Sequence, residues 1–506
     1  MTLLTFFSTI TIPLVASPLV YLSGRLGARE SMLRQRSYLV RGLSLIVIFL
    51  VWIPFVFSAK TLLAGNIQDF NLEAIWLRFD GISLVASGMV LGLGTLTILF
   101  SGPYMAGEMG EEKYYAMLLA IIGMMLGLVC ARDLFNLWVW FEGMAISSYL
   151  LVAFYREQAA SLEAGMKYLV QSAIGSVMVL LGIALVLANA GTLDMPEIQQ
   201  AVTESGVNRL NLLAAGALFI IGFGVKVAIV PLHTWLPDAH SQAPSGISAM
   251  LSGVVIEAGL IAMLRALSVL SGFTASWGIL FMAFGALNIL YGNLLALRQT
   301  MVKRMLAYSS LSHIGYILLG LGITFYSGSG LGAQGAFFHL VNHMLMKGLA
   351  FLSVGALIYG MFLQNNSHAS LTVEALAGTA QKYPWVALAL SIAVLGLGGL
   401  PPLAGFMSKW QIFVAGFQTQ NSWIIALMIF MALNSVLSLA YYAPLVNLMY
   451  RQTPSAQVLA GKPLSWAIAL PLVVMTLAVI LLGVVPQWMN FITSSAAQTL
   501  LTMFGG

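Results

Sequence analysis

Fourteen apolar stretches, each of roughly 20 residues or more, follow one another along this chain of 506 residues. A helix needs about 20 consecutive apolar residues to cross the hydrocarbon core of a membrane. Only 8% of the residues are charged, whereas soluble domains carry about 25%. The sequence therefore predicts an all-α polytopic membrane protein. The expected spans are 3–22, 39–58, 82–104, 114–131, 134–155, 165–189, 211–233, 244–271, 274–296, 301–325, 331–360, 384–417, 422–449 and 464–485.

The segments between these stretches are too short for a soluble domain. The longest expected loops, 59–81, 190–210 and 361–383, have roughly 20 residues each, and the apolar tail after Pro486 is expected at the membrane interface or against the bundle. The stretch 3–22 lacks a basic n-region and a clear cleavage site, which predicts a retained span rather than a signal peptide. The single cysteine, Cys130, supports neither a disulfide framework nor a cysteine-based metal or iron–sulfur site.

Lysine and arginine are distributed unevenly between the loops. Of the 22, fourteen lie in the odd-numbered loops, five in the even-numbered loops and three inside spans. Positive residues accumulate in cytoplasmic loops, which predicts that the odd loops are cytoplasmic and that both termini lie on the other side. The same rule explains the net charge of +5 without any nucleic-acid partner. The first odd loop leads with Arg25, Arg29, Arg34, Arg36 and Arg41.

Two of the expected spans are interrupted by proline and glycine. The seventh contains VPLHTWLP, with Pro231, and the twelfth contains GLGGLPPLAGFMSK, with Pro401 and Pro402. A lysine accompanies each interruption, namely Lys226 and Lys409. Broken spans in matching positions are the best sequence indication of inverted repeats and of a transport site. The alternative is that proline and glycine are simply common in membrane helices.

These interruptions predict a single transmembrane domain, 1–506, with internal symmetry. Each broken span is fourth in a run of five, and an offset of five spans reverses the orientation of the second run. We therefore expect three N-terminal helices in 1–110, a first five-helix repeat in 111–271, a second in 272–450, and a C-terminal helix and tail in 451–506.

Glu142 and Lys226 lie inside apolar stretches, where ionisable residues are costly and mark functional sites by default. A buried lysine whose carboxylate neighbour can move changes its protonation state readily, because burial disfavours the charged form and the carboxylate favours it. We expect Glu142 to exchange protons with Lys226. The alternatives are a static ion pair, a carboxylic acid bonded to a backbone carbonyl, and a lysine that reaches the membrane interface.

Glu257 is also in the middle of a span, within LSGVVIEAGLIAML. It is expected to relay protons between two half-channels, or alternatively to bond a neighbouring serine. Its nearest cationic candidates in the predicted topology are Lys226 and Lys347. Arg265, eight residues further on, is expected near a helix end as an anchor at the membrane interface.

A polar stripe runs along the eleventh span. His339, His343 and Lys347 are spaced at i, i+4 and i+8, so they share one helix face. A metal site would need further ligands, so the stripe predicts a proton wire, with a satisfied core network as the alternative. His313, beside several serines, is expected to be either a relay or a core residue. Lys409 is expected to be a terminal proton carrier or an exit group.

The segment after the first interruption carries His233, Asp238 and His240. His233 is expected to belong to the proton path, and the other two either form its mouth or cap the next helix. Neither a Walker A motif nor a dinucleotide fingerprint is present in the sequence, so no cofactor is expected in this chain.

Five motifs, which contain most of the residues singled out above although not Lys226, Glu257 or Arg265, occur in a characteristic order. These are NLWVWFEGMAISSYLL, PLHTWLPDAHSQAPSGISAMLSGVVI, RMLAYSSLSHIGYILLG, AFFHLVNHMLMKGLAFLSVGALIYG and GLPPLAGFMSKWQIF. Together they resemble the antiporter-like membrane subunits of respiratory complex I. That family includes the large subunits of Mrp-type cation/proton antiporters and of membrane-bound hydrogenases. The resemblance covers most of the chain, and its length is similar to the M/N-type and Mrp D-type subunits.

The resemblance implies fourteen helices with two inverted five-helix repeats. It also implies proton transfer from an entry near Glu142 and Lys226, along a central polar axis, to an exit near Lys409. His339, His343 and Lys347 match that axis. Most members have a lysine where this chain has Glu257, so its central carrier is acidic, which leaves open which cation moves.

We therefore expect a proton-translocating subunit of a multisubunit, redox-driven membrane complex, without a redox centre of its own. Its expected partners are other membrane subunits, including homologous antiporter-like ones, together with protons, possible sodium ions and lipids. An energy-coupling membrane of a bacterial or archaeal cell is the expected location. The alternatives are a subunit of an Mrp-type sodium/proton antiporter, a stand-alone solute transporter, and a scaffold with a vestigial polar axis.

Overall fold

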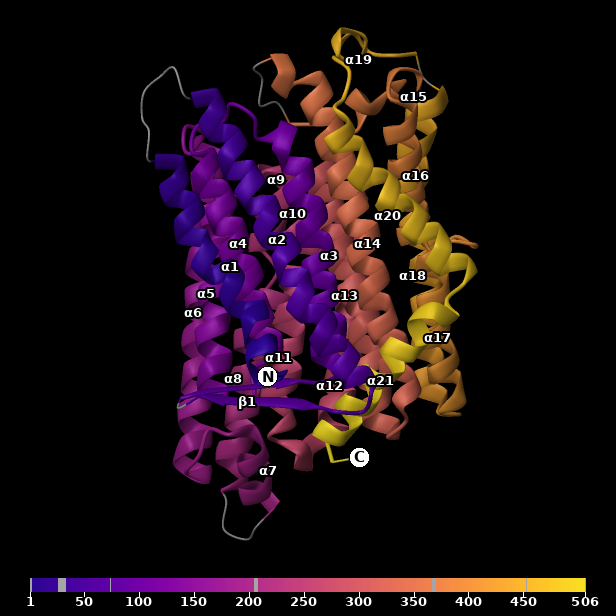
Figure 1. Ribbon diagram of the computed structural model, residues 1–506. Coiled ribbons are helices and arrows are strands. Elements are labelled where there is room, and N and C mark those ends of the chain that lie inside the picture. The colour runs from indigo at the N-terminus through magenta and orange to yellow at the C-terminus, as the bar shows by residue number, and fades with distance from the viewer. Residues whose placement is uncertain are drawn as a thin grey trace.

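The computed structural model describes residues 2–25, 33–72, 74–203, 208–365, 370–451 and 453–505 as a bundle of long helices (Figure 1). The first helices are α1 (Thr2–Arg25), α2 (Leu33–Leu63), α3 (Gly81–Tyr104), α4 (Glu111–Val129), α5 (Leu134–Val152) and α6 (Ala159–Ala190). The middle of the chain forms α7 (Met195–Thr203), α8 (Arg209–Val227), α9 (Trp235–Gln242), α10 (Ser245–Met250), α11 (Ile256–Ser268), α12 (Thr274–Ala296), α13 (Val302–Ser327) and α14 (Gly330–Met361). The last helices are α15 (Thr379–Lys382), α16 (Pro384–Gly398), α17 (Ala404–Gln418), α18 (Ser422–Arg451), α19 (Ala456–Ala460), α20 (Trp466–Val484) and α21 (Gln487–Met503).

The prediction of an all-α polytopic membrane protein is confirmed. Within the described ranges, twelve helices are long and apolar enough to cross a membrane, counting Ser245–Ser268 as one. Helix α5 occupies the predicted fifth span, and α16 and α17 together occupy the twelfth. Every expected apolar stretch thus contains helix, and the predicted interruptions at Pro231 and Pro401 separate α8 from α9 and α16 from α17.

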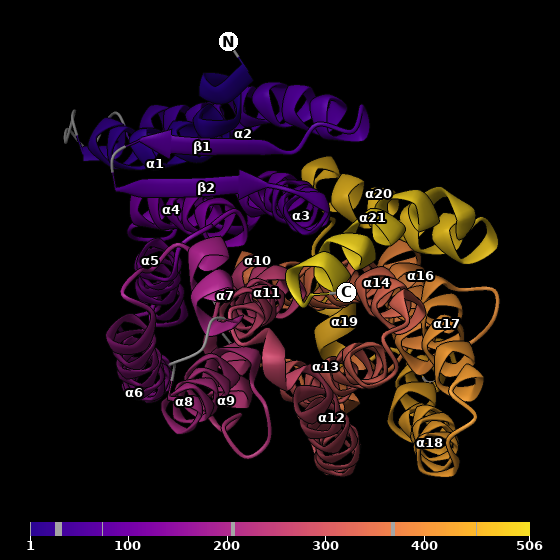
Figure 2. The ribbon, with the colours of Figure 1, turned by 90° about the horizontal axis from the view of Figure 1, so that it is seen from below.

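The most buried helices lie at the centre of the bundle. The apolar window of Ser245–Ser268 is completely buried, and those of α13 and α14 are 94% and 89% buried, against 33% for α6 and 28% for α18. Viewed from below, α11, α13 and α14 lie between α5 and α6 at one edge and α17 and α18 at the other (Figure 2). Because α11, α13 and α14 are buried in this centre, the ionisable side chains that they carry are shielded from lipid.

The central helix is not α-helical throughout. Helix α10 continues into α11 through a π-helical turn, Leu251–Val255, which comes two residues before Glu257. The turn is fully buried, and Ser252 within it hydrogen-bonds Ser310 of α13 at 2.7 Å. Single π-helical turns inside α-helices frequently occur at functional sites.

A β-hairpin replaces part of the loop predicted at 59–81. Strands β1 (Gln68–Leu72) and β2 (Ile75–Phe79) pair antiparallel, and the Arg78 guanidinium bonds the Asp69 carboxylate across the register pair, Nε to Oδ1 at 2.7 Å. Burial alone raises the pKa of Asp69, but the hydrogen bonds and charge of Arg78, together with Arg132, lower it overall. Cross-strand pairs of opposite charge stabilise a hairpin. The sequence analysis expected only a loop here, and each strand of the hairpin has just five residues.

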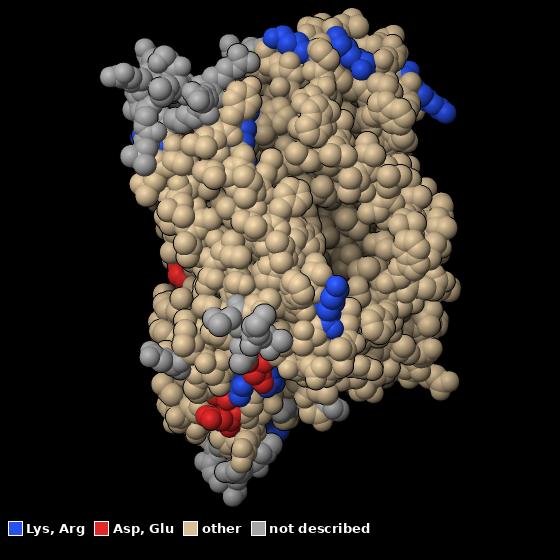
Figure 3. Space-filling model, viewed as in Figure 1, with Lys and Arg blue, Asp and Glu red and all other residues tan. Residues whose placement is uncertain are grey.

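Both termini lie at the same end of the bundle, as an even number of spans requires (Figure 1). The C-terminal tail, predicted either at the interface or on the bundle, forms α21 and packs against α3 and α14. On the face shown in Figure 3, lysine and arginine are visible at both ends of the bundle, and some of those at the terminal end lie beside acidic residues. At the opposite end, Arg25 and Arg41 pair with Glu112 and Glu111. The expected assignment of these ends to the two sides of a membrane stays a prediction.

Candidate functional site

The first break in the bundle holds a buried lysine. Lys226 lies in the last turn of α8 and is 1% exposed. Its Nζ donates to the Tyr168 hydroxyl at 2.6 Å and lies 3.5 Å from the Ser148 Oγ. The Tyr168 ring stacks on the indole of Trp235 at 3.9 Å, which fixes the hydroxyl beside the ammonium group. The lysine is therefore enclosed in the protein, and the alternative that it reaches the membrane interface is wrong.

Polar side chains replace the backbone partners lost at this break. Trp235 Nε1 donates to the Val225 carbonyl at 2.7 Å. Asn288 of α12 accepts from the Val230 amide at 2.8 Å and donates to the Ala228 carbonyl at 3.3 Å. A non-helical backbone at membrane depth is tolerated only when its polar groups are satisfied in this way. The break is consequently a built feature that holds Lys226 at the end of a half-helix.

Glu142 and Lys226 are not in direct contact, so the alternative of a static ion pair is wrong and proton exchange between them stays a prediction. Among the described residues no ion pair within 4.0 Å joins them. Glu142 lies on α5, six residues before Ser148, and is partly exposed at the edge of the bundle. Its Oε2 is buried without a hydrogen-bond partner in the described part of the chain. Proton exchange between the two groups therefore requires an intermediary such as water or a movement of one side chain.

Glu257 is bonded to a histidine rather than to either lysine considered from the sequence or to a serine. Its Oε1 lies 2.7 Å from Nδ1 of His343, and the two side chains are 1% and 0% exposed. Glu257 Oε2 and His343 Nε2 have no partner in the described part of the chain. A carboxylate and an imidazole in direct contact can pass a proton between them, since each has one conjugate state that donates and one that accepts.

His313 links His343 to His339. The rings of His313 and His343 stack at 5.2 Å, and Nδ1 of His313 lies 3.0 Å from Nε2 of His339. Nδ1 of His339 lies 2.8 Å from Oγ of Ser408, which immediately precedes Lys409 in α17. The sequence left His313 open between relay and core, and the structure places it in the middle of a buried histidine row.

Lys409 closes this row at the second break. It is 6% exposed, and its Nζ donates to the Leu397 carbonyl at 2.8 Å and to Ser435 Oγ at 2.9 Å. The ammonium group also lies 4.5 Å from the centre of the Tyr316 ring, which touches His313 and His339 edge-on. We call the contiguous set Glu257, His343, His313, His339, Ser408 and Lys409 the central row.

Lys347 lies beside the central row rather than within it. Although it shares the α14 face with His339 and His343, its Nζ donates to the Leu306 carbonyl at 2.7 Å and to Ser309 Oγ. It is fully buried. The helical spacing thus correctly placed the three side chains on one face, but their partners come from different neighbouring helices.

The side chains that follow the first break lie in two different environments. His240 is fully buried, stacks on Phe351 at 4.8 Å and has no hydrogen-bond partner at either ring nitrogen in the described part of the chain. Asp238 instead pairs with Arg304 at 2.6 Å and Lys167 at 2.9 Å. These pairs lie near the end of the bundle opposite the termini, which we call the odd-loop end because the odd-numbered loops lie there. His233 is 9% exposed and lies between α8 and α9. Only His240 is directed into the core.

A buried lysine that the sequence analysis did not single out lies near His240. Lys303, at the start of α13, is 8% exposed and donates to the Ala243 carbonyl at 2.8 Å. It lines a cavity of about 50 Å³ at the odd-loop end, together with Tyr104 and Ser241. The sequence analysis only counted it among the lysines and arginines of the odd loops, because it lies in the first turn of an expected span. Ser408 and Tyr168 were also missed, because a serine or tyrosine in a membrane helix carries no strong signal alone.

The expectation for Arg265 is wrong. Its side chain is 3% exposed rather than at the interface, and Nη2 contacts both carboxylate oxygens of Asp80 at 3.0 Å. It also donates to Ser83 and to the Val129 carbonyl. Asp80 additionally caps the N-terminus of α3. A single-chain pattern cannot show that a carboxylate 185 positions away satisfies the guanidinium.

The central row can carry protons but offers no metal site by itself. Each histidine ring is already occupied on one side by another member of the row, and no group of three His, Cys, Asp or Glu residues in the described ranges could hold a metal ion. Buried ionisable groups between two broken helices define the class of ion-translocating membrane subunits.

The chain belongs to the NADH:quinone oxidoreductase/Mrp antiporter family, whose model matches residues 131–438. It is 33% identical to NADH-quinone oxidoreductase subunit N of Trichlorobacter lovleyi over 87% of this chain and 88% of that one. It is 34% identical to hydrogenase-4 component B of Escherichia coli, over 73% of this chain and 55% of that one. A chain in the structure of the membrane-bound sulfane sulfur reductase, an archaeal respiratory membrane complex, superposes with a TM-score of 0.83 at 28% identity, covering 97% of each chain.

Proposed function

We propose that this antiporter-like, proton-translocating subunit moves protons along the central row between the two broken helices. The observation that carries the proposal is the series of contacts from Glu257 to His343, His313, His339 and Ser408, with Lys409 adjacent. Three of these contacts are hydrogen bonds, and the fourth, between His343 and His313, is a ring stack that a proton crosses with the help of water or a side-chain movement. Every member is nearly or fully buried. Buried ionisable groups at membrane depth are expensive, and retaining six polar groups in contact serves transfer better than stability.

Lys226 and Lys303 suit the role of entry groups. Lys226 stands at the first break, where Gly259 of α11 packs against its side chain, so that it adjoins the helix carrying Glu257. Lys303 lines the small cavity at the odd-loop end, and His240 with its unpartnered nitrogens lies in the nearby core. Protons from either group reach the central row through water or through movement of side chains. Lys347 and Lys409 are the remaining lysines of the site. When either one is charged, it repels a proton on a neighbouring group and so favours transfer of that proton to the next group.

The subunit is proposed to work within a multisubunit complex, without a cofactor of its own. Its relatives are subunits of redox complexes and hydrogenases, so energy would arrive from partner subunits by displacement or by charge. Placing the basic odd-loop end in the cytoplasm would set both termini outside, in the energy-coupling membrane of a bacterial or archaeal cell.

The test removes the middle of the row. His313→Phe keeps an aromatic ring against Tyr316 but eliminates both ring nitrogens, so proton uptake by vesicles containing the assembled complex should fall to the background. Tyr316→Phe is the matched control, since its hydroxyl is unpartnered in the described part of the chain, and it should pump normally. Undiminished uptake by His313→Phe would refute the route.

Sodium/proton antiport is the second candidate function, because the matching family includes Mrp antiporters. Replacing sodium with choline in the same vesicles separates the two. Proton uptake that persists in choline supports proton translocation alone, whereas uptake that requires sodium in the opposite compartment supports antiport.

A further inference from the structure

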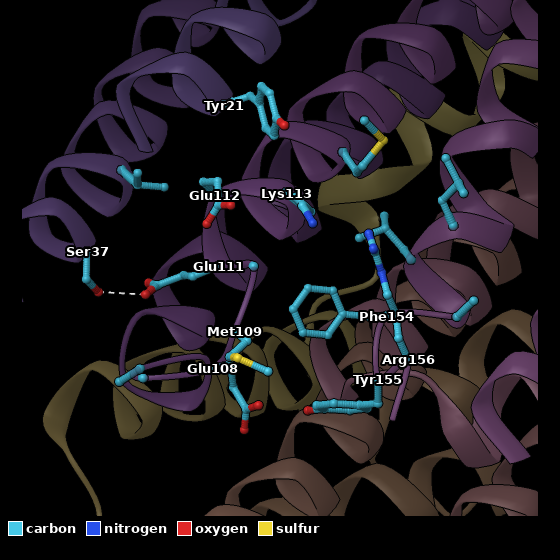
Figure 4. Close-up of a pocket in the computed structure, with 18 of the residues that line it drawn as sticks. Tyr21, Ser37, Glu108, Met109, Glu111, Glu112, Lys113, Phe154, Tyr155 and Arg156 are labelled. Atoms are coloured by element: carbon cyan, nitrogen blue, oxygen red, sulfur yellow. Dashed lines mark hydrogen bonds between the residues drawn. The ribbon is translucent and has the colours of Figure 1, made fainter. Parts of the chain in front are cut away.

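Two cavities among the described residues lie at the odd-loop end. One is the small cavity beside Lys303. The other is a groove of about 1530 Å³ between the ends of α1 and α2, the start of α4 and the turn from α5 to α6 (Figure 4). Among the described residues that line these cavities, none belongs to the central row. Neither cavity therefore connects the row with the terminal end, where both termini lie.

Gln411 lies one helical turn beyond the central row in the direction of the terminal end. It shares a face of α17 with Ser408, because the two residues are spaced i, i+3. On the neighbouring helix α14, Gly335 comes four residues before His339 and packs against the backbone at Gln411. Oε1 of Gln411 is buried and has no hydrogen-bond partner in the described part of the chain. Such an acceptor is costly in a packed interface, but it can order water.

The Gln411 side chain links α17 to the C-terminal helix α21. Its Nε2 donates to Oδ1 of Asn490 at 3.1 Å. From there α21 carries a polar residue at every fourth position, Asn490, Ser494, Gln498 and Thr502, which we call the polar side of α21. Steps of four residues keep side chains along one side of a helix. The first two are partly buried and the last two are exposed, so the series opens toward the end of α21, which lies at the terminal end (Figure 1).

An amphipathic helix that lies at a membrane interface is the alternative explanation for α21. Such a helix also carries polar residues on one side and apolar residues that contact lipid or the bundle. Trp488 is largely exposed and Leu500 is fully buried, as this alternative expects. It does not explain why Asn490 is bonded to an amide that lies one turn from Ser408 and keeps a second, buried oxygen without a partner in the described part of the chain. The bond therefore favours a role that is linked to the central row.

We propose that α17 and α21 form the outlet through which protons leave the central row at the terminal end. The proposal rests on the function proposed above, because the outlet begins where the row ends, at Ser408 and Lys409. Gln411 and Asn490 are positioning residues, since an amide donates and accepts hydrogen bonds without titrating. They order the water through which the proton moves to the polar side of α21. Each water accepts one proton and releases another, so no side chain of the outlet changes its charge.

The test places a metal ion on the polar side of α21. Asn490→His with Ser494→His puts two imidazoles at i, i+4, the spacing with which histidines on one helix face bind Zn²⁺. Zn²⁺ is trapped in the lumen of vesicles that contain the assembled complex, because protons that leave at the terminal end enter the lumen. Proton uptake should be at least about tenfold lower than in the same variant without Zn²⁺, since the bound ion repels protons from the outlet. A membrane-permeant chelator should restore uptake.

Trp488→His with Ile492→His is the matched control, because it places the same pair of imidazoles on the opposite side of α21. Proton uptake by this variant should not respond to Zn²⁺ in the lumen. Gln411→Leu is a second test that needs no metal. It removes the unpartnered oxygen, and it should lower proton uptake at least about threefold because an apolar side chain orders no water.

Three results would overturn the outlet. They are unchanged uptake by Asn490→His with Ser494→His although the purified complex retains Zn²⁺, equal inhibition of the matched control, and wild-type uptake by Gln411→Leu. His313→Phe in the same vesicles separates this proposal from the route along the central row. If His313→Phe abolishes uptake while any of the three results is obtained, only the outlet is wrong. If His313→Phe pumps normally, the row is wrong and the outlet fails with it.

Discussion

Glu257→Gln is the most informative single change, because glutamine has nearly the shape of glutamate but cannot titrate. In the structure, Glu257 Oε1 contacts Nδ1 of His343 at 2.7 Å. A glutamine amide can keep one hydrogen bond to that nitrogen. A neutral hydrogen bond contributes about 0.5–1.5 kcal/mol and one to a charged group about 1.5–3 kcal/mol. We therefore expect the variant to fold, with a loss of unfolding free energy of about 1 kcal/mol.

The effect on transport should be much larger than the effect on stability. Without a titratable group at this position, a proton crosses the gap as an unassisted charge near the membrane centre. Such a charge costs about 2.5–3.5 kcal/mol on helix-insertion scales. Since about 1.4 kcal/mol of barrier corresponds to a tenfold change in rate, proton uptake should fall roughly 100-fold.

The assay compares the initial rate of proton uptake by vesicles that contain equal amounts of assembled complex. Glu374→Gln is a chemically identical control on the surface, and its rate should equal that of wild type. Glu257→Lys, which keeps a titratable group at this position, should retain part of the activity if surrounding water can reorganise. Wild-type rates for Glu257→Gln would show that the carboxylate is structural and that protons bypass it.

Three further changes test other parts of the site. Lys226→Arg should stop proton uptake although the positive charge remains, because arginine does not release its proton; normal uptake would exclude titration of this group. Lys409→Ala should reduce proton uptake at least about tenfold, since it removes the last titratable group of the central row, and wild-type uptake would reassign the lysine to a packing role. Asp80→Ala should lower the free energy of unfolding by about 3–5 kcal/mol, because it leaves Arg265 buried without its partner. Thermal unfolding in detergent measures this loss, and an unchanged midpoint would contradict it.

The sequence was sufficient for the helices, the breaks and the identity of most ionisable residues at the site. Apolar length depends only on the local chain, and the prolines at 231, 401 and 402 disrupt helices wherever they occur. The i, i+4, i+8 spacing placed His339, His343 and Lys347 on one face for the same reason.

Contacts between helices could not be obtained in this way. Periodicity gives the face that a helix buries but not its rotation or height against a neighbour. Glu257 was therefore assigned lysines as its nearest candidates, whereas the packing of α11 on α14 brings it to His343. Arg265 was misplaced because its carboxylate partner comes from the distant N-terminus of α3. Likewise, the sequence could not show that Tyr168, rather than Glu142, is the direct partner of Lys226.

The π-helical turn Leu251–Val255 sets the rotation of the following helix, α11, about its axis. Each α-helical residue advances the side chain by about 100°, so a turn that holds one extra residue offsets everything after it by that angle. Glu257 points at His343 only with this offset in place. If the turn relaxed to α-helix, the same carboxylate would face a different neighbour while α10 kept its packing. The backbone of five residues without an ionisable side chain, Leu251–Val255, thus sets which group the central acid can address.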